Sequence, residues 1–213
     1  MVTSNHIHLL VLDTGKDVIP KSIQLVAGRT AQEFNQRKNR KGAFWEDRYH
    51  AVAVETDEHL IKCLVYIDLN MVRAGVVKHP SEWPHGGYRE ILNPPKRYSI
   101  IDQKTLISKC GSLSKEQFKN DYQGWVEATT SNGKPSRESA WSESVAVGSK
   151  KFIENIKENL GVKAKGRKTV RQGEGFVLNE PQSSYKADFA HNLGLLSLDN
   201  IYYWELCDDI SDR

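Results

Sequence analysis

The sequence predicts an α+β protein, and two stretches in its first half carry most of this prediction. Residues 6–12 read His-Ile-His-Leu-Leu-Val-Leu and are followed by the turn-forming residues 13–15 (Asp-Thr-Gly). A short apolar run that ends in such a turn favours a buried strand. Residues 57–74 carry apolar side chains at helical spacing and end at Gly75, which indicates a helix; the apolar positions are Leu60, Leu64, Ile67 and Met71.

The remaining elements extend this pattern along the chain. Helices are expected from Ile19 to Gly42, from residues 114 to 128 and from Ser149 to Gly161, and short strands at residues 51–54 and 176–178. Ser149 can cap its helix, whose N-terminus could bind an anion such as phosphate. The breaker at residues 93–96 (Asn-Pro-Pro-Lys) predicts a boundary between residues 1–93 and a mostly helical extension, residues 94–213, for which DNA binding is a candidate role. A late aromatic cluster is interpreted as core: Tyr185, Phe189, Leu193, Tyr202, Tyr203 and Trp204.

Composition restricts the function classes. The chain has 213 residues with 27% charged and 38% hydrophobic side chains, and it contains no apolar run long enough for a transmembrane helix and no signal peptide. Its three cysteines (Cys63, Cys110 and Cys207) form neither a zinc-binding spacing nor a disulfide framework. A cytoplasmic protein without a membrane partner is therefore expected, and Cys63 is interpreted as a small buried hydrophobic residue.

Basic residues are clustered although the net charge is only +3. One cluster contains Arg37, Lys38, Arg40 and Lys41, and the other contains Lys163, Lys165, Arg167, Lys168 and Arg171. Either cluster can be a solvated surface, but two of them on a nearly neutral chain favour phosphate contacts. The intervening aromatic and charged stretch, residues 43–50 with Trp45 and Arg48, suits stacking on unpaired bases; its rings can equally cap a core.

His6 and His8 form the first candidate site. On a strand, residues i and i+2 face the same side, about 7 Å apart at Cα, so the two imidazoles could share a divalent metal while Ile7 packs into the core. The alternative is one core histidine and one exposed histidine.

Tyr66 and Asn70 form the second candidate site, because residues four apart lie on one face of a helix. A tyrosine hydroxyl can attack a phosphodiester and hold the released strand as a phosphotyrosine. The Asn70 amide oxygen could be a third metal ligand beside the two histidines, and oxygen with imidazole suits Mg²⁺ or Mn²⁺. Taken alone, Tyr66 would be an ordinary half-buried helix tyrosine.

Three segments together resemble a known family. Residues 4–10 (Ser-Asn-His-Ile-His-Leu-Leu), 42–49 (Gly-Ala-Phe-Trp-Glu-Asp-Arg-Tyr) and 66–75 (Tyr-Ile-Asp-Leu-Asn-Met-Val-Arg-Ala-Gly) stand in the order found in single-tyrosine HUH transposases. Trp83-Pro84 followed by Tyr88 is similar to the branch of REP-associated tyrosine transposases. The resemblance covers residues 1 to about 92, and residues 140–204 look like the C-terminal extension of longer members.

The resemblance implies a ferredoxin-like nuclease domain that acts on single-stranded DNA, often at the foot of a hairpin. His6, His8 and Asn70 would be the metal ligands and Tyr66 the nucleophile, leaving a 5′-phosphotyrosine and a free 3′-hydroxyl. Arg48, Arg73 and the basic cluster that begins at Arg37 are the candidates for phosphate contact. Related transposases act as monomers or homodimers, and no small-molecule substrate is expected.

The chain departs from the family at two places. Met71 stands where this branch usually has proline after the asparagine, and methionine continues a helix better than proline. Family members also have a strand and a helix before the histidine strand, so the domain is expected to lack its first strand and helix. The rival hypotheses are a DNA-binding protein that has lost catalysis and a structural α+β domain without a site.

Overall fold

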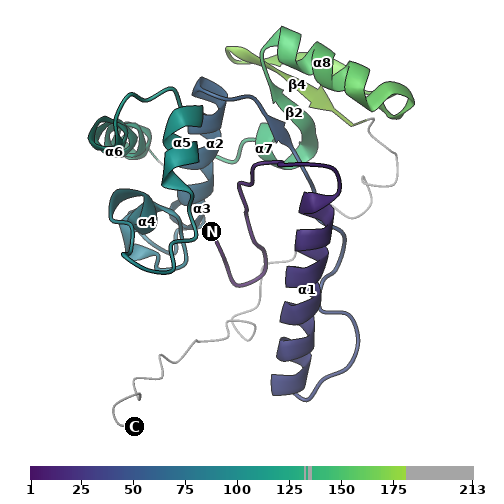
Figure 1. Ribbon diagram of the computed structural model, residues 1–213, viewed down its shortest axis with the longest axis vertical. Helices are drawn as coiled ribbons and strands as arrows, with labels where there is room; N and C mark the ends of the chain where they lie inside the picture. Colours follow the sequence, from purple (N-terminus) through teal and green to yellow (C-terminus); the bar gives the residue numbers. More distant parts are fainter. Residues whose placement is uncertain (132, 134–135, 181–213) are drawn as a thin grey trace. The chain divides into compact units, whose positions relative to one another are not determined.

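The computed structural model describes residues 1–131, 133 and 136–180. The late aromatic cluster and Cys207 lie outside these residues. The described chain has the element order α1 (Val18–Arg37), β1 (Ala53–Val54), α2 (Glu58–Asp68), α3 (Asn70–Arg73), η1 (Pro80–Glu82), α4 (Tyr88–Leu92), α5 (Gln103–Lys109), α6 (Lys115–Ser131), α7 (Ala140–Glu143), β2 (Ser144–Gly148), α8 (Lys150–Leu160), η2 (Gly161–Ala164), β3 (Lys168–Gln172) and β4 (Gly175–Asn179) (Figure 1). The predicted α+β class is confirmed.

The four strands form one mixed sheet in the order β1-β2-β4-β3. β1 is parallel to β2, whereas the β2–β4 and β4–β3 pairs are antiparallel. Because side chains alternate along a strand, the sheet has two apolar faces. Ala146 and Leu178 pack with Ile153 of α8, and their neighbours Val147 and Val177 pack with Ala140 of α7.

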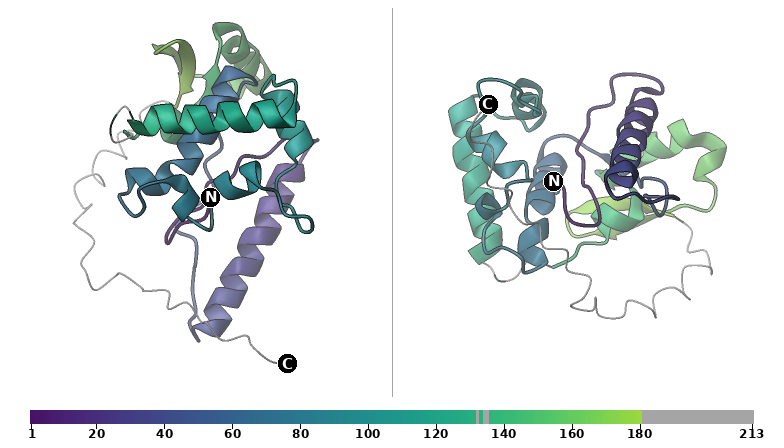
Figure 2. Two further views of the ribbon diagram at one scale, coloured as in Figure 1. Left: turned by 90° about the vertical axis from the view of Figure 1, so that its left-hand side faces the viewer. Right: turned by 90° about the horizontal axis from the view of Figure 1, so that it is seen from below.

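A second core joins four helices. Leu64, Val65 and Leu69, from α2 and the residue that follows it, are buried with residues of α4 and α6; these partners are Tyr88, Ile91, Phe118, Tyr122 and Val126. Leu106 and Ile107 of α5 pack against this cluster. Figure 2 shows α6 beside the other helices of the group. Helices from both sides of residues 93–94 therefore share one hydrophobic core.

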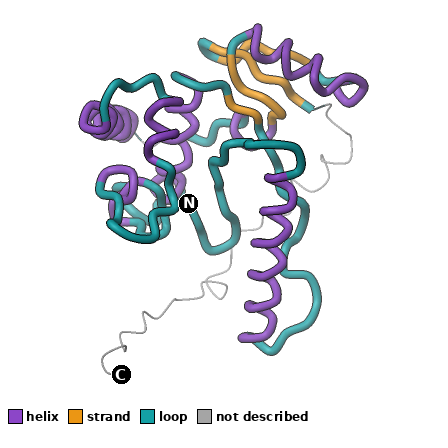
Figure 3. Tube along the Cα trace, viewed as in Figure 1, coloured by secondary structure: helices purple, strands orange, loops and turns teal. Residues whose placement is uncertain are grey.

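The strand predicted at residues 6–12 is wrong. The pairing of this segment is a single antiparallel bridge between Val2 and Ile7, and residues 9–12 are drawn as loop (Figure 3). The apolar side chains of residues 9–12 (Leu9, Leu10, Val11 and Leu12) are 37–55% exposed. A strand needs a neighbour to satisfy its backbone groups, and the sheet is built from other segments. The ferredoxin-like arrangement that the resemblance implies is therefore not confirmed.

Helix α1 ends at Arg37, before the predicted stop at Gly42. The cause is local, because Asn39 adopts a left-handed conformation with φ of 46° that a helix cannot continue through. α1 has no buried residue. Its half-buried face meets the loop that follows it, where Phe34 and Phe44 lie 4.7 Å apart between ring centroids.

The second half contains more strand than the mostly helical extension predicted. The strand at residues 176–178 is confirmed as part of β4, whereas β2 and β3 were not predicted. β2 is a run of small and β-branched residues (Ser-Val-Ala-Val-Gly), and β3 carries mostly polar side chains because it lies at the edge of the sheet.

The start of α8 confirms the predicted cap. The Ser149 hydroxyl accepts a hydrogen bond from the Phe152 amide at 3.2 Å. The Glu55 carboxylate accepts hydrogen bonds from both the amide and the hydroxyl of Ser149. The anion expected at this helix N-terminus is thus supplied by the chain itself.

None of the described helices is both long enough and apolar enough to cross a membrane.

Candidate functional site

The segment that carries the histidines is a short hairpin, residues 1–8, which we call the histidine hairpin. The Thr3 amide donates to the His6 carbonyl at 3.0 Å, and the His8 amide donates to the Met1 carbonyl at 2.9 Å. These two bonds close the turn, so both imidazoles project from one short, constrained loop. The rings meet edge to face with their centroids 4.8 Å apart.

A second loop holds the histidine hairpin in place. The Val2 amide donates to the His85 carbonyl at 2.9 Å, and the Trp83 indole donates back to the Val2 carbonyl at 2.9 Å. Tyr88, which follows in the same segment, is buried in the helical core. Trp83 and Tyr88, which only the resemblance had pointed to, therefore connect the hairpin to the helices.

The histidine hairpin meets Asn70, the first residue of α3. The single helix predicted at residues 57–74 is divided at Leu69 into α2 and α3. The Asn70 amide nitrogen lies 2.9 Å from Nε2 of His8. Burial lowers the pKa of His8 to about 4, and the nearby His6, Arg73 and N-terminal amino group contribute to this lowering. Burial also lowers the pKa of His6, which the hydrogen bond with Asn70 partly offsets. Both imidazoles are therefore neutral at neutral pH, the state in which they can donate a lone pair to a metal.

The donor types of His6, His8 and Asn70 suit a divalent metal, and the spacing of one pair can be compared with metal geometry. Two ligands at about 2.1 Å and at right angles around an octahedral ion are separated by about 3.0 Å, close to the 2.9 Å between Asn70 and His8. The amide would present its oxygen after a rotation of its terminal group. No group of three or more His, Cys, Asp or Glu side chains in the described part of the chain could hold a metal. Water or phosphate would therefore complete the coordination.

Tyr66 lies on α2, four residues before Asn70, and has a different set of neighbours. The Arg73 guanidinium stacks on its ring at 3.8 Å, and Nη1 of Arg73 donates to the Tyr66 carbonyl at 2.8 Å. The Trp141 ring follows at 6.1 Å between centroids. Tyr66 is only 8% exposed, and no hydrogen bond between described residues joins it to His6 or His8. The structure thus brings the two histidines to Asn70, whereas Tyr66 is held by Arg73.

Arg73 lies between the two halves of the site. Besides stacking on Tyr66, its positive charge contributes to the lowered pKa of His8. Burial lowers the pKa of Arg73 itself, which nevertheless stays charged at neutral pH. Nη2 of Arg73 is buried and has no hydrogen-bond partner among the described residues. A buried donor without an acceptor is costly, so this nitrogen would gain from an anionic ligand.

Asp68 is a residue that sequence reasoning missed. It is 1% exposed although its side chain is a carboxyl group, and it lies on α2 two residues after Tyr66. The Tyr122 hydroxyl donates to Oδ2 of Asp68 at 2.6 Å, and the Gly87 amide donates to Oδ1 at 3.1 Å. The signal was an acidic residue between two apolar residues, Ile67 and Leu69, at the apolar end of this helix. Asp68 connects the site helix to α6 and to the loop before α4.

The other predicted DNA contacts lie at the end of α1 and in the loop after it. Arg37, Lys38, Arg40, Lys41 and Arg48 are all exposed. The Trp45 indole donates to the Ala27 carbonyl of α1 at 2.9 Å and packs edge-on against Phe44. This geometry gives Trp45 a structural role in fixing the loop against α1.

The two described cysteines have no place in the site. Cys63 and Cys110 are buried, and burial raises their thiol pKa values to about 12 and about 11. Such thiols are unreactive at neutral pH. The interpretation of Cys63 as a small buried hydrophobic residue agrees with this environment.

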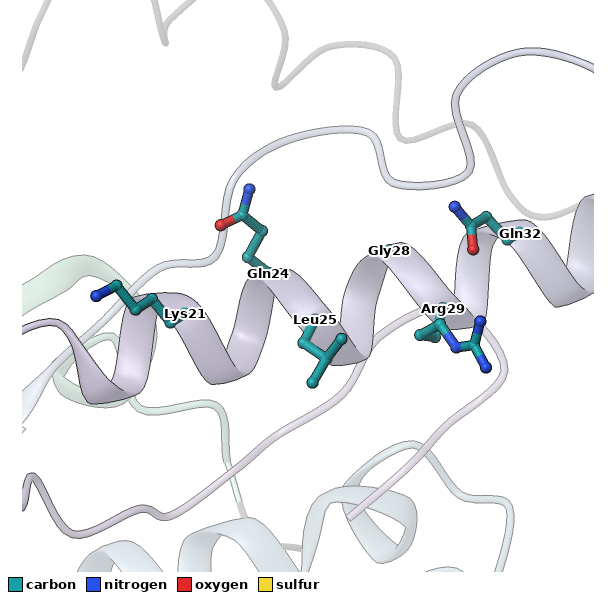
Figure 4. A pocket seen from close by; sticks show the side chains of 6 residues that line it. All are labelled: Lys21, Gln24, Leu25, Gly28, Arg29 and Gln32. Carbon is teal, nitrogen blue, oxygen red and sulfur yellow. The ribbon is translucent and has the colours of Figure 1, made fainter.

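Two hollows lie on the described surface. A shallow groove of about 330 Å³ runs along α1 and is lined by that helix alone, with Leu25, Arg29 and Gln32 among its residues (Figure 4). A larger cavity of about 820 Å³ is lined by Tyr66 and Arg73 together with residues of α6, α7 and the β3–β4 hairpin. The larger cavity therefore adjoins the candidate nucleophile, and we call it the Tyr66 cavity.

Comparison with known proteins gives one match. The family described as "Transposase IS200 like" matches residues 1–70, a range that contains His6, His8, Tyr66 and Asn70. No curated protein and no solved structure matches the chain. Residues 1–70 are similar to IS200-like transposases, and this similarity supports a transposase-like function in general, with DNA as the partner.

Proposed function

We propose that this protein is a single-tyrosine transposase that cleaves and rejoins single-stranded DNA, of the type closest to the REP-associated branch. The observation that carries the proposal is the contact between His8 and Asn70, four residues after Tyr66, within the range that matches IS200-like transposases. His8 and Asn70 are distant in sequence but lie 2.9 Å apart, and His6 lies beside His8, an arrangement that suits a metal-assisted nuclease.

The proposed metal site consists of His6, His8 and Asn70. Mg²⁺ or Mn²⁺ bound there would polarise a non-bridging phosphate oxygen and stabilise the charge that develops on it. The chain's own residues do the positioning. The histidine hairpin and the Trp83 loop fix the imidazoles, and Asp68 and Tyr122 fix the end of α2, two residues before Asn70.

Tyr66 is the proposed nucleophile. Its hydroxyl loses a proton and its oxygen forms a bond to the phosphorus, while the bond from phosphorus to the 3′-oxygen breaks and that oxygen gains a proton. The products are a 5′-phosphotyrosine and a free 3′-hydroxyl. Attack by another 3′-hydroxyl reverses the step and rejoins the strand without an external energy source.

Arg73 is the proposed phosphate anchor. It stacks on the nucleophile's ring, lies close enough to His8 to lower its pKa, and has a buried nitrogen without an acceptor among the described residues. The exposed basic cluster, Arg37, Lys38, Arg40 and Lys41, would hold the strand farther from the site.

A labelled hairpin oligonucleotide mixed with the protein and Mn²⁺ tests the proposal. A covalent protein–DNA adduct on a denaturing gel that is absent in Tyr66→Phe supports the enzyme. Binding without an adduct supports the alternative, a hairpin-binding protein derived from a transposase that has lost catalysis. The arrangement that favours this alternative is the packing of Tyr66 under Arg73 without a hydrogen bond to either histidine among the described residues.

A further inference from the structure

The Tyr66 cavity is built by two parts of the chain that are distant in sequence. Helix α2 contributes one wall, and α6, α7 and the β3–β4 hairpin contribute the others. Its volume of about 820 Å³ is ample for a flat aromatic ligand with its attached sugar. Because the similarity to IS200-like transposases ends at residue 70, most of this cavity lies outside the matched range.

Aromatic side chains line the Tyr66 cavity on three elements. Tyr66 comes from α2, Trp125 from α6 and Trp141 from α7. Each indole is fixed on one side: Trp125 meets Phe118 of the core, with 6.4 Å between ring centroids, and Trp141 packs on the Ala140–Val147–Val177 cluster. Both remain only half-buried. Rings that are fixed on one side and accessible on the other are suited to stacking on a planar ligand.

The charges around the cavity disfavour a phosphate inside it. Glu58, Glu138 and Glu174 are among its lining residues. Lys62, also a lining residue, is paired with both Glu58 and Glu174, and the other lining cation, Arg73, stacks on Tyr66. Three carboxylates therefore outnumber the two cations, and away from Arg73 a neutral planar group is preferred to an anion. Carboxylates accept hydrogen bonds, which favours a ring that carries an amino group.

Arg73 links the cavity to the metal-binding side chains. Its guanidinium stacks on Tyr66 at the cavity wall, and its charge acts on His8. A nucleotide whose phosphate accepted a hydrogen bond from the buried Nη2 of Arg73 would have its base within reach of the aromatic walls. The Tyr66 cavity and the Arg73 guanidinium thus match the base and the phosphate of one nucleotide.

We propose that the Tyr66 cavity binds an unpaired nucleobase that carries an exocyclic amino group, from the nucleotide next to the scissile phosphate. This inference rests on the proposed function for the identity of the strand. It assigns the C-terminal extension a direct part in substrate recognition, through Trp125, Trp141 and Glu138.

Binding to single-stranded probes tests the proposal. The protein would carry Tyr66→Phe, which keeps the ring and prevents covalent attachment. Fluorescence anisotropy would give the affinity for oligo(dA), oligo(dC), oligo(dT) and an abasic oligonucleotide of equal length. We expect oligo(dA) and oligo(dC) to bind more tightly than oligo(dT), and all three to bind more tightly than the abasic strand. Equal affinity for all four probes would overturn the proposal, and equal affinity for oligo(dT) and oligo(dA) would overturn the preference for an amino group.

Substitution of Trp141 tests whether the base-dependent part of the affinity arises in the Tyr66 cavity. Loss of one stacked base costs about tenfold in affinity, so Trp141→Ala should weaken oligo(dA) binding by about that factor and leave abasic binding unchanged. Trp141→Phe is the matched control, which should retain most of the affinity. Equal losses for both probes in Trp141→Ala would indicate a damaged fold or a backbone contact and would overturn the assignment.

The same experiments separate this inference from the proposed function. Base-dependent binding needs no covalent chemistry, so it can be present when the hairpin oligonucleotide forms no adduct. In that case the binding of a base by the Tyr66 cavity stands, whereas the transposase proposal fails and with it the assignment of that base to the nucleotide next to a scissile phosphate. An adduct formed by the wild-type protein together with base-independent binding would support the transposase proposal and overturn the cavity assignment.

Discussion

The hydrogen bond between Tyr122 and Asp68 is the contact whose loss we expect to be most informative. Both residues are buried, at 0% and 1% exposure, and the oxygens lie 2.6 Å apart. Tyr122→Phe removes the donor and keeps the ring. Asp68 would then keep a single described donor, the Gly87 amide at 3.1 Å.

The expected loss of unfolding free energy is worked out for the ionised form of Asp68, which the hydrogen bond from Tyr122 stabilises. A hydrogen bond to a charged group contributes about 1.5–3 kcal/mol, and a buried charge that loses its partner costs up to about 5 kcal/mol. Because the Gly87 bond remains, we expect Tyr122→Phe to lower the free energy of unfolding by about 2–3 kcal/mol at about pH 7. For a protein of this size that corresponds to a fall in Tm of roughly 4–12 °C.

The loss of unfolding free energy in Tyr122→Phe should depend on pH, and its direction follows from the pKa shift of Asp68. Burial raises the pKa of Asp68, and the bonds from Tyr122 and Gly87 partly offset that rise. The folded state therefore holds a proton more tightly than the unfolded state, so this group's contribution to stability is complete below its ordinary pKa and is lost as pH rises through the folded pKa. Removing the Tyr122 hydroxyl raises the folded pKa of Asp68 further. The variant therefore loses more stability than the wild type as pH rises, so the difference in unfolding free energy between them is larger at about pH 7 than at about pH 4.

Urea denaturation followed by circular dichroism, repeated across this pH range, measures the effect. Tyr98→Phe is the matched control, because Tyr98 is 94% exposed and the same atom is removed there. Equal unfolding midpoints for the two variants, or a difference that does not change with pH, would refute the reasoning. Asp68→Asn added to Tyr122→Phe should recover part of the stability at about pH 7, since the buried charge is then absent.

Four further outcomes follow from the described contacts. His8→Ala should weaken Mn²⁺ binding by at least about tenfold, measured by titration calorimetry, and unchanged affinity would exclude the proposed metal site. Trp83→Phe removes the donor to the Val2 carbonyl and should cost about 1 kcal/mol and speed amide exchange in residues 1–8; unchanged exchange would mean that the bond does not hold the histidine hairpin. Cys63, whose thiol pKa is raised by burial to about 12, should react with a thiol reagent only after urea unfolding, whereas rapid native labelling would contradict its burial. Glu55→Ala removes the acceptor at the start of α8 and should cost about 1–3 kcal/mol, and an unchanged unfolding midpoint would show that solvent replaces it.

The sequence by itself determined the features that depend on local spacing. The sequence predicted the helical region that carries Tyr66 and Asn70 from its apolar spacing, although the structure divides that region at Leu69 into α2, which carries Tyr66, and α3, which begins at Asn70. The helix that begins after Ser149 and ends at Gly161 was predicted for the same reason, through its cap and its apolar stripe. The expectation that His6 and His8 lie together agrees with the 4.8 Å between their ring centroids, although a hairpin and not the predicted strand brings them together.

Only the tertiary structure decided how these local units meet. Residues 9–12 read as a strand, but a strand exists only where a neighbour completes its hydrogen bonds, and the sequence pattern does not record whether one is present. The pairing of β1 with β2 joins residues about ninety positions apart, a long-range contact that no local pattern specifies. The burial of Asp68 against Tyr122 and the stacking of Arg73 on Tyr66 are likewise set by packing between elements. Spacing predicted Tyr66 and Asn70 close together in one helical region, and packing decided that Tyr66 lines a cavity while Asn70 meets the histidines.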